Sequence, residues 1–109
     1  MRKRFLLPMV LVSVFAFGYS QAQSDSSVQP KSGFVPNAET AVKIAEAVLV
    51  PVYGEKKILA ERPFNAKLGG DVWTVIGSLH CGAPHCVGGT AEVKISKSSG
   101  QILQMVHYK

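Results

Sequence analysis

The sequence has few of the residues and none of the motifs that catalysis usually requires. Its 109 residues include two cysteines, three histidines and seven acidic side chains, and the acids are scattered along the chain. There is no His-Glu-x-x-His pattern, no Gly-x-Ser-x-Gly elbow and no glycine loop that would cradle a phosphate. No two acidic residues are placed to face each other, which favours a solvated surface role. We therefore predict that the protein is not an enzyme and carries no cofactor.

The chain also lacks a basic stripe. Its formal net charge is +5, from twelve basic and seven acidic residues. Three of the basic residues precede position 5, so the remainder carries nine against seven, or +2. Lys56 and Lys57 are the only adjacent basic pair in that remainder. Nucleic-acid binding requires clustered charge with aromatic platforms, and we predict no nucleic-acid partner.

The N-terminus has the pattern of a secretory signal peptide. The basic residues Arg2, Lys3 and Arg4 precede an apolar run over 5–17, and Ser20 and Ala22 suit the −3 and −1 pockets of a signal peptidase. A transmembrane anchor is the alternative, but the run is shorter than the ~20 residues that a span needs. We predict residues 1–22 to be removed and the protein to be periplasmic or secreted, with no stable membrane insertion after cleavage.

The mature chain divides into a linker and one domain. Residues 23–33 are rich in Ser and Gln, with Val28 as their one apolar side chain, so they cannot bury enough surface to order themselves. Residues 34–109 then form the single folded unit. A domain of this size has a small core and little stability to spare.

A helix is predicted first in this domain, over 37–53. Apolar residues recur at i, i+3, i+4 and i+7, and Asn37 can cap the free amide of Thr40. Pro51 should kink or end the helix, and Gly54 should close it in a left-handed conformation.

Four strands follow, predicted at 58–68, 72–79, 90–96 and 102–108. Pro63 makes the first an edge strand or a bulged one. The second has apolar residues on both faces and is predicted to be central and largely covered. In the third, Ala91, Val93 and Ile95 should point inward and Thr90, Glu92, Lys94 and Ser96 outward. Trp73 and Tyr53 are predicted core residues, and His107 a surface residue.

Short connections make consecutive strands antiparallel neighbours, and one helix covers one face of a small sheet. The expected fold class is therefore α+β, with one N-terminal helix packed on a four-stranded antiparallel meander sheet. The second face should be exposed unless a partner covers it.

The densest cluster of reactive side chains is His80, Cys81, His85 and Cys86. An exported location favours a disulfide between Cys81 and Cys86. A zinc site using all four residues is an alternative, although four ligands from seven consecutive residues are hard to arrange around one ion. A cysteine–histidine nucleophile pair is a third, but it lacks an orienting carboxylate.

Several segments together resemble a known family: Ile44–Ala47, Pro51–Gly54, Arg62–Phe64, Val72–Gly77, Gly88–Gly89 and Ile95–Gly100. They are similar to the small immunity proteins of bacterial polymorphic toxin systems, which have a nuclear transport factor 2-like (cystatin-like) fold. The likeness covers residues 34–109. It implies a non-catalytic protein that neutralises a cognate toxin by binding it. The cluster at 80–86 is not a general feature of that family.

The leading hypothesis is an exported immunity protein whose partner is a cognate toxin. Its candidate contacts are His80, His85, Thr90, Glu92 and Lys94. A periplasmic binding or protease-inhibitor module of the PepSY type is the alternative, since it also pairs a helix with a small sheet and a W-x-V strand. A zinc-binding protein that uses residues 80–86 is the third hypothesis.

Overall fold

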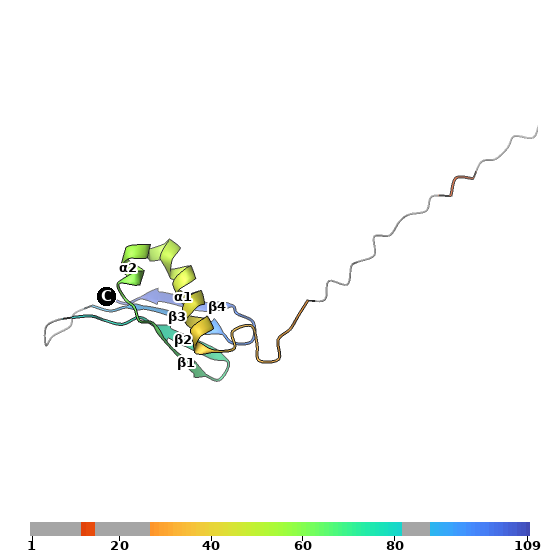
Figure 1. Ribbon diagram of the computed structural model, residues 1–109. Helices are drawn as coiled ribbons and strands as arrows, with labels where there is room; N and C mark the ends of the chain where they lie inside the picture. The colour runs from red at the N-terminus through yellow and green to blue at the C-terminus, as the bar shows by residue number, and fades with distance from the viewer. Residues whose placement is uncertain (1–11, 15–26, 82–87) are drawn as a thin grey trace, which may run out of the picture.

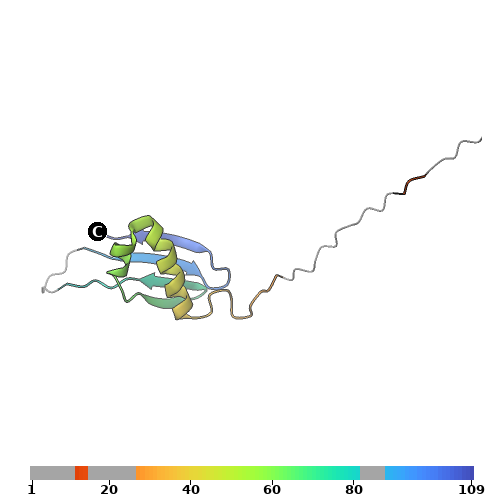
Figure 2. The ribbon, with the colours of Figure 1, turned by 45° about the horizontal axis from the view of Figure 1, so that its top comes forward.

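Two helices precede four strands in the computed structural model, which describes residues 12–14, 27–81 and 88–109. The elements are α1 (Ala38–Tyr53), α2 (Glu55–Leu59), β1 (Asn65–Gly69), β2 (Val72–Ile76), β3 (Ala91–Ser96) and β4 (Ile102–His107). The strands form one antiparallel sheet in the order β1-β2-β3-β4. Both helices lie on the same face of this sheet (Figures 1 and 2). The predicted α+β meander with a helix on one face is confirmed.

Helix α1 begins as its sequence predicts. The side chain of Asn37 accepts a hydrogen bond from the amide of Thr40 at 2.8 Å, which satisfies one of the free amides of the first turn. The residues that α1 buries completely are Ala41, Ala45 and Leu49. These three follow at intervals of four, so they form one stripe along the helix, and that stripe faces the sheet.

The end of α1 differs in detail from the prediction. The helix continues through Pro51 to Tyr53, because the proline lies in the last turn and removes a single hydrogen bond. Gly54 has a positive φ of 99°, as expected, but its ψ of 142° is not that of a left-handed helix. This residue ends α1 and precedes α2, so it turns the chain between the two helices.

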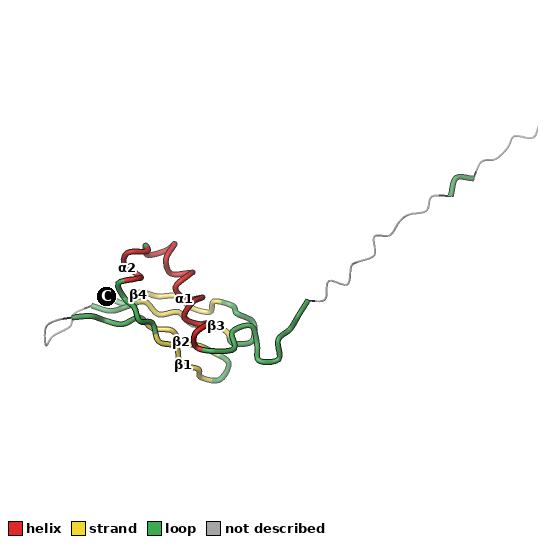
Figure 3. Tube along the Cα trace, viewed as in Figure 1, coloured by secondary structure: helices red, strands yellow, loops and turns green. Residues whose placement is uncertain are grey.

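The first predicted strand is partly wrong. Residues 55–59 form the short helix α2. The strand begins only at Asn65 and ends at Gly69, one residue beyond the predicted segment 58–68. Figure 3 shows α2 on the helical side of the sheet, followed by a loop that leads into β1. Ile58 is fully buried and attaches α2 to the core. A five-residue helix with one buried side chain is too short to show a period of 3.6.

The core lies between α1 and the sheet. It contains Val35, Ala41, Ala45, Leu49, Ile58, Phe64, Trp73, Val75, Ala91, Val93 and Ile95. The indole N–H of Trp73 donates to the carbonyl of Val35 at 2.8 Å, so its polar group is satisfied inside the core. The predicted core position of Trp73 is confirmed.

Candidate protein-binding face

The sheet face opposite the helices carries no element of the described chain (Figure 1). We call it the open face. Because side chains alternate along a strand, it is formed by those that flank the helix-facing core residues: Asn65 and Lys67 of β1; Val72, Thr74 and Ile76 of β2; Glu92 and Lys94 of β3; Gln104 and Val106 of β4. The second strand is central and largely covered, as predicted, except at its end on the open face. Ile76 remains 42% exposed.

Strand register arranges the open face into cross-strand rows. One row runs from Lys67 through Thr74 and Lys94 to Gln104. The adjacent row runs from Asn65 through Ile76 and Glu92 to Val106. Directly opposed side chains in such rows lie about 5 Å apart. The face therefore has one row with two lysines beside one with two apolar residues and a single carboxylate.

Aromatic and aliphatic side chains add contact area at the β4 edge. Tyr108 is 49% exposed and Leu103, at an irregularity in the pairing of β3 with β4, is 47% exposed. The Tyr108 hydroxyl donates to Glu92 at 3.3 Å. The negative charge of Glu92 raises the pKa of Tyr108. The phenol thus stays neutral and keeps its hydrogen bond to the carboxylate of Glu92.

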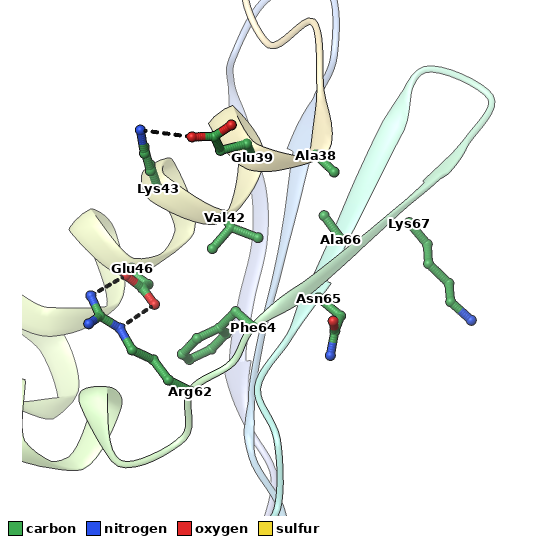
Figure 4. Close-up of a pocket in the computed structure, with 10 residues that line it drawn as sticks. All are labelled: Ala38, Glu39, Val42, Lys43, Glu46, Arg62, Phe64, Asn65, Ala66 and Lys67. Carbon is green, nitrogen blue, oxygen red and sulfur yellow. Dashed lines mark hydrogen bonds and ion pairs between the residues drawn. The ribbon is translucent and has the colours of Figure 1, made fainter.

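A hollow lies on the helical side, between α1 and the edge strand β1 (Figure 4), with a volume of about 800 Å³. Two ion pairs line it. Arg62 binds Glu46 through two hydrogen bonds of 2.9 and 2.8 Å, which raise the pKa of the guanidinium, and Lys43 lies 3.2 Å from Glu39. Four of its charged groups are thus paired with one another, whereas Lys67, which also borders this hollow, and Lys94 of the open face form no ion pair in the described part.

Comparison with known protein families identifies the chain. The family model of the NTF2 fold immunity protein matches residues 40–109. The chain belongs to this immunity-protein family. The match covers α1 from its third residue, α2 and the whole sheet, so the resemblance seen in the sequence is confirmed. Neither the curated proteins nor the solved structures gave a match.

Two of the predicted contact residues of this immunity protein lie on the open face. Glu92 and Lys94 are half-buried neighbours on β3. Thr90 is buried, contrary to its predicted outward position, because its hydroxyl donates to the carbonyl of Gly77 at 3.0 Å. Ser96 is also buried instead of outward, and its hydroxyl donates to Asp71 at 3.2 Å.

The predicted cluster at 80–86 is only partly within the described residues. His80 is exposed, and its Nε2 lies 2.5 Å from the carbonyl oxygen of Arg62. His85 and Cys86 lie outside the described residues, so the disulfide from Cys81 to Cys86 and the alternative zinc site stay predictions. Within 12–14, 27–81 and 88–109, no group of three or more His, Cys, Asp or Glu side chains is placed to hold a metal ion.

One polar cluster was missed by the sequence reasoning. Glu61 and His107 were assigned to the surface, but both are largely buried, and the carboxylate lies 2.8 Å from His107 Nε2. The ring of His107 also packs on Tyr53, with centroids 5.3 Å apart. The two partners are 46 residues apart in the sequence, so no local pattern indicates the pair.

The membrane prediction concerns segments that are mostly outside the description. No described helix is both long and apolar enough to cross a bilayer. The predicted signal peptide and its cleavage after Ala22 fall on residues 1–11 and 15–26, outside the described residues apart from 12–14, and they stay predictions.

Proposed function

We propose that this chain is an exported immunity protein that binds a cognate bacterial toxin through its open face and so neutralises it outside the cytoplasm. Membership of the NTF2 fold immunity proteins supports the general role. The observation that carries the binding mode is the one-sided architecture, in which both helices cover one face of the sheet. Export is supported by the charged, apolar and small-residue pattern of residues 2–22.

Exposed apolar residues on the open face and at its β4 edge favour contact with a partner protein. Ile76 on the face, and Leu103 and Tyr108 at the edge, are each more than 40% exposed. Protein interfaces combine such aromatic and aliphatic contacts with a polar surround. In the described chain nothing covers these residues, so a partner would gain by burying them.

The size of the sheet indicates that the contact extends beyond it. Four strands of five or six residues, at a spacing of ~4.8 Å and a rise of ~3.3 Å, give a planar footprint of roughly 300 Å². A stable complex buries about 800 Å² on each partner. The described flanks of the β2–β3 connection, residues 77–81 and 88–90, run past the end of the sheet (Figure 2) and would supply part of the remainder.

Co-expression with the toxin gene encoded beside this one tests the proposal. We expect the full-length chain to restore growth and to co-purify with the toxin. A chain that begins at Gln23, without residues 1–22, should bind the toxin in vitro but fail to protect cells from toxin directed to the periplasm. Protection by this cytoplasmic form would contradict export, and the absence of both rescue and complex would contradict toxin binding altogether.

A surface variant with a matched control tests the face. We expect Ile76→Asp, on the open face, to weaken the complex, and Val52→Asp to leave it unchanged, since Val52 is 60% exposed on the helical side. Equal binding by wild type and Ile76→Asp, with both folded by circular dichroism, would exclude the open face.

A further inference from the structure

The open face has a hollow of about 260 Å³ at the boundary of β1 and β2, lined by Asn65, Lys67, Thr74, Ile76 and Gly77. We propose that this hollow is a socket for an acidic side chain of the toxin, and that the immunity protein recognises its partner through a carboxylate bound there. The inference rests on the proposed function and names the chemistry of the partner's contact. We call the hollow the socket.

The polar groups of the socket have no partners of their own. Among the described residues, the Asn65 amide, the Lys67 ammonium and the Thr74 hydroxyl make no side-chain hydrogen bond and no ion pair. Asn65 and Lys67 also line the hollow on the helical side, but Figure 4 shows their side chains pointing away from α1, whereas Val42 and Phe64 lie between α1 and β1. Three donors therefore converge on one hollow that the fold itself leaves unfilled.

Positive charge is concentrated beside the socket. Lys67 and Lys94 are the direct cross-strand neighbours of Thr74, one on each side. Their strands lie about 10 Å apart, because adjacent strands are separated by ~4.8 Å. An anion near Thr74 would interact with both ammonium groups. The one carboxylate of the open face in the described chain, Glu92, already accepts the Tyr108 hydroxyl.

The walls indicate a side chain with an apolar stem, such as glutamate. Ile76 supplies an exposed aliphatic surface next to the donors. A carboxylate gains most from several N–H and O–H donors with a nearby cation. A basic toxin residue would meet two unpaired lysines, and an apolar one would leave three donors unsatisfied. An acidic residue matches all of these groups.

The experiment measures association and dissociation between the mature immunity protein and the neighbouring toxin by surface plasmon resonance, at low and physiological salt. We expect Lys67→Glu and Lys94→Glu each to weaken binding by tenfold or more, with much of the loss in the association rate. The matched controls are Lys56→Glu and Lys57→Glu, which make the same charge change on α2 at exposed positions on the helical side. These should bind within about twofold of wild type.

Removing the hydroxyl without changing charge separates a specific socket from general attraction. Thr74→Val keeps the branched shape of the side chain, and we expect it to raise the dissociation rate several-fold while leaving the salt dependence unchanged. A toxin in which the contacting Glu is replaced by Lys should recover binding to Lys67→Glu. Thermal unfolding of each variant confirms that the sheet is intact.

Binding of Lys67→Glu and Lys94→Glu at wild-type strength would overturn the socket while leaving the proposed function intact. An equal loss in the α2 controls would also overturn it, because the effect would then come from net charge. If wild type neither rescues cells nor binds the toxin, the proposed function fails first and the socket fails with it.

Discussion

Replacing Glu61 should destabilise the protein more than any other change of a single charged residue in the described chain. Its Oε1 accepts a hydrogen bond from the buried amide of Ala91 at 2.8 Å, and its Oε2 lies 2.8 Å from His107 Nε2. Its own carbonyl accepts the amide of Ser78 at 2.7 Å. Glu61, which follows α2 in the chain, is thus bonded to β3, to β4 and to the residues that follow β2.

The Glu61 carboxylate takes the place of a backbone hydrogen bond that is missing where β2 and β3 separate. Gly77 donates its amide to the carbonyl of Ala91 at 3.0 Å, but the Gly77 carbonyl accepts the Thr90 hydroxyl instead of the Ala91 amide. Glu61 satisfies that amide. His107 completes the cluster with Nδ1 at 2.9 Å from the Tyr108 carbonyl. Both ring nitrogens of His107 therefore lie within hydrogen-bond distance of an oxygen atom.

The magnitude follows from these contacts. In Glu61→Ala, a buried amide loses its acceptor, which costs about 1–3 kcal/mol, and the largely buried His107 ring loses its carboxylate partner. Breaking a buried pair in this way costs about 3–5 kcal/mol in total. A domain of this size has a free energy of unfolding of about 4–11 kcal/mol, so the variant should be marginally folded. Glu61→Gln keeps one acceptor and should lose about 1–2 kcal/mol.

Urea unfolding followed by the fluorescence of Trp73 measures these losses, since Trp73 is the one tryptophan of the chain and is buried. Glu39→Ala is the control, because its pair with Lys43 is exposed and should contribute less than about 0.5 kcal/mol. A double-mutant cycle with His107→Ala should give a coupling energy above about 1 kcal/mol. A loss below about 1 kcal/mol in Glu61→Ala, or a coupling of zero, would refute the reasoning.

Two further predictions concern a close contact and a pH dependence. We expect Gly77→Ala to cost about 1–3 kcal/mol, because its Cβ would lie 2.9 Å from Phe64 and 3.0 Å from the Glu61 carboxylate, whereas Gly69→Ala meets no atom within 4 Å and should be nearly neutral in the same urea assay. The Ser98 hydroxyl lowers the pKa of Asp71, so this carboxylate stabilises the fold at neutral pH and ceases to do so as the pH falls through the lowered pKa. The difference in melting temperature between wild type and Asp71→Asn should therefore shrink below the ordinary pKa of 3.8, and a constant difference would contradict this assignment.

The elements that the sequence predicts well are those defined by local spacing. The cap at Asn37, the buried stripe of α1, strands β2 to β4 and the turn at Gly100 each depend on residues within a few positions of one another. Helix α2 was missed because Ile58 is its one buried side chain, and a single residue has no period. The outward prediction for Thr90 and Ser96 failed because hydroxyl groups bury readily once they bond to nearby acceptors.

The candidate site was harder to predict because it depends on register and on long-range pairs. Glu92 and Lys94 were chosen from alternation alone, and they do lie on the open face. Lys67, Thr74 and Asn65 were not chosen, because their convergence follows from the pairing of β1 with β2. The β1 bounds were themselves mispredicted, so the sequence could not align these side chains.

The apolar side chains of β2 on the open face indicate where a partner is expected to bind. Val72 and Ile76 on that face predict a covered strand, since exposed apolar residues gain from burial. The chain could provide that cover with its own elements, but both described helices lie on the other side. The cover is then expected from another molecule. On this argument, a strand whose pattern predicts burial, and whose own fold leaves it open, supports the proposal that this immunity protein binds its toxin through the open face.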